Sequence, residues 1–326
     1  MSAAAALVVG EALIDEVLTA DGEVTSVPGG SPANVAVGLA RLGVRTELLC
    51  TLGEDAQGEA LRTHLREAGV GLRTPAAASP AATSTARAVL DAEGAAQYAF
   101  AVDWEPGPFR PGPVPLLHTG SLAMMLEPGA SQVEDALAAA EPGTLRSLDP
   151  NVRPSLGLAP GEMRERIERF ARHVHVLKLS DEDLSFVHPG VSAERALDAL
   201  HAAGTPLVVL TRGAGGCTLS TPEGRRDLEA TPAAVVDTIG AGDSFMAGLL
   251  FAILRSGGVQ ELLDGAASWP RLESWARTAM HCAAITVGRA GAEPPWAREL
   301  DAAVQRETIS SVPAKTRPEA SRTIVV

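Results

Sequence analysis

The sequence predicts an α/β protein with three layers, α/β/α, in which a mostly parallel central sheet carries a small β lid. Short apolar runs typical of buried strands alternate with longer segments of helical periodicity, which is the pattern of a parallel sheet with helices on both faces. Residues 84–100 break this alternation with two strand-like runs around a turn. The chain has 326 residues, of which 46% are hydrophobic and 21% charged, so it can bury a sizeable core.

The central elements follow in order along the chain. Strands are expected at 7–14, 46–52, 115–119, 145–148, 174–179 and 206–211. Helices are expected at 32–42, 59–68, 131–140, 162–172, 193–203 and 244–254. Helix 32–42 has the clearest ends, because Ser31 suits an N-cap, Pro32 suits the first helical position and Gly43 follows the last periodic residue.

Two segments predict the lid, with strands at about 15–28 and 84–104. Residues 17–27 contain an Asp-Gly turn, and residues 84–100 read as a hairpin around Asp-Ala-Glu-Gly. Together they are expected to form a small antiparallel sheet over the site; the alternative is a surface hairpin without function. Residues 301–326 are rich in Ser, Thr, Pro and charge, which predicts a C-terminal tail after one domain at 1–300.

Charge and cysteine content exclude several classes of protein. A net charge of −13 argues against nucleic acid or an anionic membrane as partner, since both need a basic face. The first residues lack the basic segment of a signal peptide, and no stretch approaches a membrane span. Three widely separated cysteines form no metal or disulfide pattern, so a reducing cytoplasm is the expected setting. The two lysines, Lys178 and Lys315, belong to no GxxxxGK[ST] loop.

The segment that carries the chemistry is DTIGAGDSF, residues 237–245. Gly240, Ala241 and Gly242 let backbone N–H groups converge, and the helix that follows adds unpaired donors and a positive dipole end, so we expect an anion hole here. Asp243 falls in the first helical turn, where its carboxylate is placed to accept a hydroxyl proton during phosphoryl transfer. The alternative is an ordinary helix start that Asp243 merely caps.

Two motifs together resemble the ribokinase-like (PfkB) carbohydrate kinases. DTIGAGD at 237–243 resembles their C-terminal signature, and GGSPAN at 29–34 resembles their sugar-binding glycine motif. The similarity runs from about residue 7 to 295. It implies the ribokinase-like fold, ATP and Mg²⁺ as cofactors and a sugar as substrate. It also implies Asp243 as the base, K⁺ as a further ion and a homodimer through the lid.

The resemblance implies the following substrate residues: Asp15, Gly29, Gly30, Asn34 and Asp243, with Arg153 near the transferred phosphate. Tyr98, with Phe100 and Trp104, is an aromatic residue near the predicted lid and a further candidate to cover a sugar face. An amide side chain and close backbone approach suit an uncharged polyol, and a guanidinium suits an anion. Each of these has an alternative without function. Asn34 could bond to local backbone and Arg153 could form a surface ion pair. Tyr98, Phe100 and Trp104 could form the hairpin's own small core.

For the nucleotide, the resemblance implies contacts from Lys178, Ser180, Thr211, Gly213, Gly216 and Gly291. Asp183 is expected to bind Mg²⁺ through water, and Asp237 with Ile239 to hold a monovalent cation. Ser180 and Asp183 stand where the family has Asn and Glu, which puts the metal affinity in question; Asp181 or Glu182 are candidates to compensate. The alternative for this segment is an acidic helix N-terminus.

The sugar is expected to be fructose, because GEALID, the extended glycine motif and DPNVRP are most similar to fructokinases. A 2-keto-3-deoxygluconate kinase, a ribokinase or another sugar or nucleoside kinase remain alternatives within the family. A catalytically weak sugar sensor on the same fold is the alternative from another class.

Overall fold

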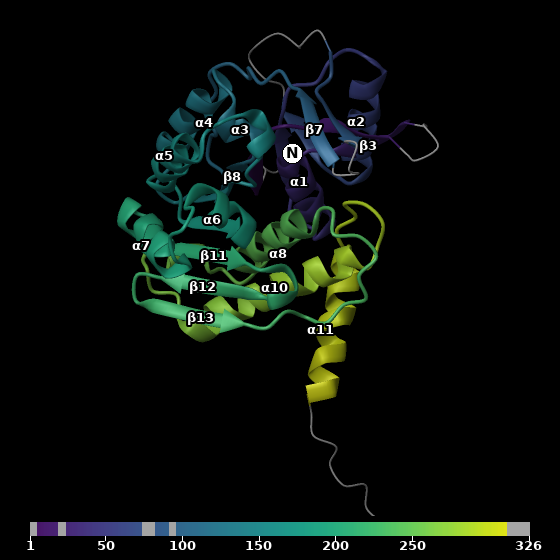
Figure 1. Ribbon diagram of the computed structural model, residues 1–326. Coiled ribbons are helices and arrows are strands. Elements are labelled where there is room, and N and C mark those ends of the chain that lie inside the picture. Colours follow the sequence, from purple (N-terminus) through teal and green to yellow (C-terminus); the bar gives the residue numbers. More distant parts are fainter. Residues whose placement is uncertain (1–4, 19–23, 74–81, 91–95, 312–326) are drawn as a thin grey trace, which may run out of the picture.

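The computed structural model describes residues 5–18, 24–73, 82–90 and 96–311 (Figure 1). Its strands are β1 (Ala6–Val9), β2 (Leu13–Leu18), β3 (Val24–Gly29), β4 (Thr46–Leu49), β5 (Gly71–Arg73), β6 (Thr85–Leu90), β7 (Ala96–Ala101), β8 (Leu116–Gly120), β9 (Leu145–Asp149), β10 (Val176–Ser180), β11 (Leu207–Thr211), β12 (Cys217–Thr221) and β13 (Gly224–Leu228). Its α-helices are α1 (Ser31–Arg41), α2 (Ala56–Glu67), α3 (Leu122–Met125), α4 (Gly129–Ala138), α5 (Pro160–Ala171), α6 (Asp181–Val187), α7 (Ala193–Ala203), α8 (Ala241–Arg255), α9 (Val259–Leu263), α10 (Trp269–Val287) and α11 (Ala297–Ser311).

The large sheet has nine strands in the order β13-β12-β11-β10-β9-β8-β1-β4-β5. Neighbours from β11 to β5 pair in parallel, whereas β12 and β13 add an antiparallel edge. The strand order reverses at β1, whose neighbours are β4 and β8. In open α/β sheets, ligands bind beyond the carboxyl ends of the strands near such a reversal.

Helices cover both faces of this sheet, which confirms the predicted three layers. Successive strand residues point to opposite faces: Ala6 and Val8 join a core with α1, α2, α8 and α10, and Leu7 and Val9 join a second core with α4, α5 and α7. Most predicted elements therefore lie where the apolar pattern placed them, within a few residues at each end.

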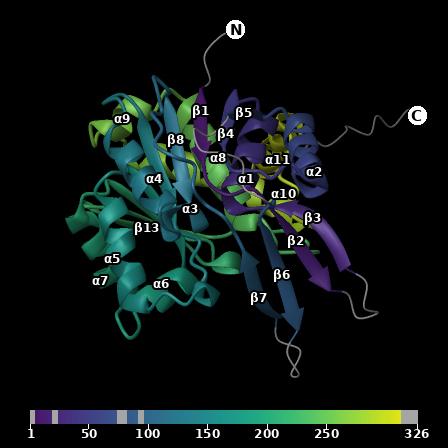
Figure 2. The same cartoon turned by 90° about the horizontal axis from the view of Figure 1, so that it is seen from above.

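The small sheet has the order β3-β2-β6-β7 and projects from the body of the molecule (Figure 2). The β2–β3 and β6–β7 pairs are antiparallel as expected. The central β2–β6 pair is parallel, so the prediction of an antiparallel sheet was wrong for this pair. Within each hairpin the two strands are consecutive in the sequence with a short connection, which requires antiparallel pairing. The pairing between the hairpins has no such local requirement.

Two further predictions need correction. The apolar run 7–14 is two strands, because the chain leaves the large sheet after Val9 and enters the small one at Leu13. The predicted tail at 301–326 begins inside α11, so the domain boundary at 300 divides a helix. Leu300 of α11 is buried in the core. Nε2 of His281 in α10 lies 2.7 Å from Oε2 of Glu307 in α11. Residues 312–326 lie outside the described part of the chain.

Close helix packing positions the start of α8. A methyl group on Gly38 of α1 would approach the Ala247 side chain of α8 to 2.6 Å, and one on Gly248 would approach Cys282 of α10 to 2.8 Å. Small residues thus let α8 lie closely between α1 and α10. Helix α8 accordingly carries an almost entirely apolar sequence after its first turn and is buried along most of its length.

None of the helices in the described ranges is both long and apolar enough to cross a lipid bilayer.

Candidate active site

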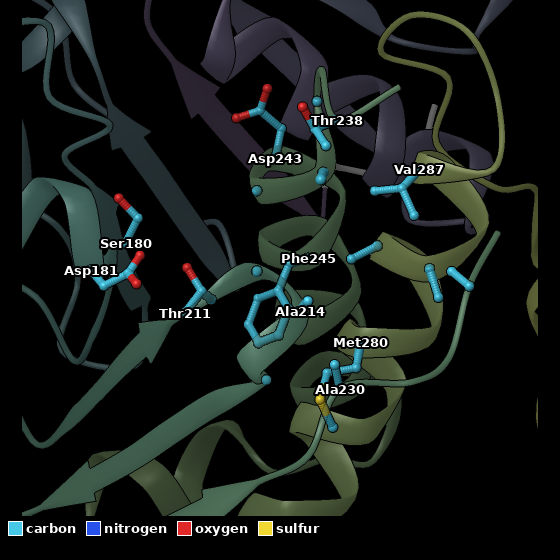
Figure 3. A pocket seen from close by; sticks show the side chains of 18 of the residues that line it. Ser180, Asp181, Thr211, Ala214, Ala230, Thr238, Asp243, Phe245, Met280 and Val287 are labelled. Carbon is cyan, nitrogen blue, oxygen red and sulfur yellow. The ribbon is translucent and has the colours of Figure 1, made fainter. Parts of the chain in front are cut away.

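A cavity of about 860 Å³ opens beyond the carboxyl ends of β9, β10 and β11 and reaches the start of α8. Figure 3 shows Ser180, Asp181 and Thr211 on one side of it and Asp243 with Thr238 on the other. Eleven of the predicted site residues line the cavity: Arg153, Lys178, Ser180, Asp183, Thr211, Gly213, Gly216, Gly240, Ala241, Gly242 and Asp243. Segments far apart in the sequence therefore converge as the fold class requires.

The turn before α8 has the backbone that its glycines predict. Gly240 is left-handed, with φ of 72°, and packs against Ala292 so closely that a side chain would meet it at 2.6 Å. The helix begins at Ala241, so the first amide groups of α8 have no acceptor within the helix. These amides line the cavity, where a helix N-terminus favours an anion.

The carboxylate of Asp243 is held from α1. Ser31 donates its hydroxyl to Oδ1 at 2.6 Å, and Asn34 donates its amide to Oδ2 at 2.9 Å. The two predicted motifs thus touch through side chains more than 200 positions apart. Ser31 was expected to cap α1, but Gly30 occupies the cap position and no side chain caps the helix. Its hydroxyl bonds to Asp243 instead, so the predicted cap was wrong.

Lys178 brings a buried positive charge to the anion hole. Its ammonium lies 2.7 Å from Asp149 Oδ2, and a methyl group on Gly242 would approach Nζ to 3.1 Å. Burial alone would lower the pKa of Lys178, but the Asp149 carboxylate outweighs it and the pKa is raised. Burial raises the pKa of Asp149 to about 6 despite the lysine. Both groups are therefore charged at neutral pH. Asp149 was not among the site residues predicted from the sequence.

Asp183 lies at the start of α6 with both oxygens bound to backbone. Oδ1 accepts from Val152 N–H at 2.8 Å and Oδ2 from Ser180 N–H at 2.9 Å, while Ser180 Oγ accepts from Asp183 N–H. This is a capping box that also ties down the loop after β9. Arg153 in that loop donates to Asn151 Oδ1 at 2.6 Å and makes no surface ion pair among the described residues.

Asp15, Gly29 and Gly30 lie together where the small sheet meets α1. A side chain on Gly29 would collide with the Asp15 carboxylate, and φ of 102° at Gly30 requires a glycine. Burial raises the pKa of Asp15 to about 6, although Arg153 lowers it; the charge of Asp243 adds to the increase. Arg153 and Asp243 are therefore both close enough to Asp15 to influence its charge.

Glu11, which the sequence analysis did not single out, is a further buried carboxyl beside this group. Burial raises its pKa to about 7, while Ser121 and the more distant Arg153 lower it. Its place directly after β1, at the strand-order reversal, is the signal that would have found it.

The predicted cation residues lie beside the cavity, outside its lining. Asp237 accepts from Ile239 N–H at 3.0 Å and from Gly291 N–H at 2.8 Å, and these bonds lower its pKa. Gly291 thus meets Asp237, and Ile239 is exposed. Within the described ranges, no three His, Cys, Asp or Glu side chains are grouped as metal ligands. The side chain of Tyr98 in β7 lies outside the described residues.

The far end of the cavity is apolar, which the sequence analysis did not foresee. Phe245, Met280 and Val287 line it together with Ala230 (Figure 3). These side chains come from α8, α10 and the segment after β13, and none of these elements except α8 carried a motif. A pocket with a polar anion-binding end and an apolar end suits a ligand with phosphates and a flat base.

Comparisons with known proteins agree with this geometry. Residues 3–298 match the pfkB family of carbohydrate kinases. The chain is 33% identical to the fructokinase of Klebsiella pneumoniae over 77% of this chain and 84% of that one. It is 34% identical to the probable fructokinase-4 of Arabidopsis thaliana, over 90% and 93% of the two chains.

Solved structures give the same picture. The fructokinase of Xylella fastidiosa with bound ATP has a TM-score of 0.79 and 25% identity over 93% of this chain and 98% of that one. The aminoimidazole riboside kinase of Salmonella enterica has a TM-score of 0.74 and 25% identity over 92% and 99%. With the motifs and the cavity, these likenesses show that the chain belongs to the pfkB family and is an ATP-dependent carbohydrate kinase.

Proposed function

We propose that the protein phosphorylates fructose to fructose 6-phosphate, with Asp243 as the base. The observation that carries this proposal is the position of Asp243 in the first turn of α8, beside the amides at 240–242 and near the Lys178 ammonium. A carboxylate next to an anion hole is the arrangement that phosphoryl transfer to a hydroxyl needs. The fructokinases among the relatives favour fructose over the other sugars.

Each end of the cavity has a role in this proposal. The apolar end holds the base, and the segment from Thr211 to Gly216 holds the phosphates. The γ-phosphate lies at the first turn of α8, where Lys178 and Arg153 balance its charge. Asp15, Gly29, Gly30 and Asn34 bind the sugar where the small sheet meets α1, and Tyr98 remains a candidate for a further sugar contact.

Mg²⁺ fits this site as an ion that arrives with ATP and keeps most of its water, because the described residues offer no ready-made ligand cage. Asp183, Asp181 and Glu182 line the cavity and would hold it through water. When bound, the ion neutralises charge on the phosphates. K⁺ beside Asp237 and Ile239 is supported by a Vibrio cholerae fructokinase structure that contains potassium.

A homodimer through the small sheet and a cytoplasmic location complete the proposal. The first is supported by β3, an edge strand on which Val24 and Val27 are 53% and 44% exposed. The second is supported by Cys50, Cys217 and Cys282, which are all free and buried.

The test measures initial rates of ADP formation with ATP and Mg²⁺ across fructose, ribose, 2-keto-3-deoxygluconate, tagatose phosphate and adenosine. We expect the highest kcat/KM for fructose. A tenfold higher value for another substrate would replace fructose as the assignment. Sugar binding by calorimetry without turnover on any substrate would favour the sensor instead.

A further inference from the structure

The two oxygens of the Asp243 carboxylate are held by two different side chains of one helix turn. Ser31 Oγ lies 2.6 Å from Oδ1 and Asn34 Nδ2 lies 2.9 Å from Oδ2. Ser31 is 6% exposed and Asp243 7%, so the bond from Ser31 is shielded from bulk water, whereas the bond from the half-buried Asn34 is shielded in part. A hydrogen bond to a charged group in such surroundings is stronger than one between neutral groups.

Three close contacts of the residues around Ser31 hold it in this position. Pro32 packs against Gly10 after β1, and Gly30 lies against the backbone of Glu11. Gly38, two turns further along α1, touches Ala247 of α8, so the two helices are held closely together. The Ser31 hydroxyl is free to reach Asp243 because it does not cap its own helix. Close packing therefore fixes the distance between Ser31 and the base.

The two donors differ in what else they can do. A serine hydroxyl has one proton, and Ser31 uses it on Asp243. An asparagine amide has two N–H groups and an oxygen, so Asn34 can form hydrogen bonds to Asp243 and to a sugar hydroxyl at the same time. Of the two oxygens, Oδ1 is therefore fixed by a donor with no second use, and Oδ2 is bound by a donor that can turn to the substrate.

We propose that Ser31 is a positioning residue that anchors Oδ1 of Asp243 and so presents Oδ2 as the atom that takes the proton. This inference rests on the proposed role of Asp243 as the base. In the step, the sugar O–H bond breaks and an Oδ2–H bond forms. The sugar oxygen forms its bond to the γ-phosphorus while the bond from that phosphorus to the bridging oxygen breaks, and its electron pair leaves with ADP.

The test compares three variants with the wild type, using whichever sugar the wild type turns over fastest. Ser31→Ala removes the anchor, and we expect kcat to fall about tenfold or more, as loss of a charged hydrogen bond predicts. The KM values for sugar and ATP stay within about twofold, because the sugar and nucleotide contacts remain. Ser31→Thr keeps the hydroxyl and restores most of kcat.

Ser244→Ala is the matched control. Ser244 follows the base directly and is also buried, but its hydroxyl accepts from Thr286 at 2.7 Å, whereas the described donors to the Asp243 carboxylate are Ser31 and Asn34. We expect wild-type kcat from this variant, with a loss of Tm at least as large as that of Ser31→Ala. That pattern separates orientation of the base from general destabilisation.

Three results would overturn the inference. They are a kcat near that of the wild type in Ser31→Ala, an increase in sugar KM without a change in kcat, and an equal loss of kcat in Ser244→Ala. Because the wild type is measured first on the full sugar panel, a wrong substrate assignment is detected separately and leaves the Ser31 comparison intact.

Discussion

Two aspartates in this molecule have nearly the same surroundings and differ in their donors. Asp243 and Asp183 both lie in the first turn of a helix, are 7% and 8% exposed, and accept a hydrogen bond on each oxygen. The donors to Asp243 are side chains of α1. The donors to Asp183 are the backbone amides of Ser180 and Val152.

The difference separates a group that reacts from a group that holds structure. A side chain such as Asn34 can rotate toward a substrate and leave a lone pair of Asp243 available. A backbone amide is fixed by the chain on either side, so Asp183 keeps its partners for as long as the loop and helix keep their form. Burial and helix position alone do not reveal which role an acid has; its donors do.

Replacing the base tests the first half of this comparison and has the largest expected effect. Asp243→Asn keeps the shape of the side chain but cannot accept a proton, so we expect kcat to fall about 100-fold or more. ATP binding, measured by calorimetry, stays largely intact because the amides at 240–242 remain. Turnover near the wild-type value would contradict the role of Asp243 as the base.

A third aspartate sharpens the comparison through pH. Burial raises the pKa of Asp15 to about 6, so this carboxyl becomes protonated as the pH falls through that value, where an ordinary aspartate stays ionised. A protonated Asp15 is a poorer acceptor for sugar hydroxyls. We expect the sugar KM to rise about tenfold between pH 7.5 and 5, as titration at this pKa predicts.

Asp15→Asn is the control for that measurement, because Glu11 and Asp149 have pKa values of about 7 and about 6 and titrate nearby. In this variant the sugar KM is expected to be high and nearly constant over the same pH range. A pH-dependent KM that persists without the Asp15 carboxyl would assign the effect to one of the other two acids.

Replacing Asp183 tests the second half and has the smallest expected effect on the rate. In Asp183→Asn, one of the two backbone amides faces an N–H group in place of an oxygen. We expect the free energy of unfolding to fall by about 1–3 kcal/mol in urea denaturation, with kcat within about threefold. An unchanged unfolding curve with a large increase in the Mg²⁺ concentration for half-maximal rate would mean that the proposed contact of Asp183 with Mg²⁺ through water outweighs its structural role.

The central sheet could be predicted well because its signals are local. Apolar runs such as 206–211 and helix starts such as Pro32 report burial and backbone geometry directly. Pairings are not local, so the parallel β2–β6 contact and the division of 7–14 between two sheets escaped the sequence analysis. Helix α11 escaped it because Leu300 is its main contribution to the core.

Most residues of the candidate site could be predicted from the sequence, but the hydrogen bonds between them could not. The resemblance pointed to both Asn34 and Asp243, but nothing in either motif says that one bonds the other. The bond from Ser31 to Asp243 was missed because a serine hydroxyl suits an N-cap as well as it suits a distant carboxylate. The packing of α1 on α8 decides which of the two it binds. Asp149 was missed because its partner Lys178 lies on the neighbouring strand.

A single residue separates the small sheet from the helix that holds the base: β3 ends at Gly29 and α1 starts at Ser31. Gly30 itself lies against the backbone of Glu11 and Ala12. The end of the small sheet and the first turn of α1 are therefore joined through one closely packed residue. The residues proposed to bind the sugar and the two donors to the Asp243 carboxylate thus belong to one continuous stretch of chain.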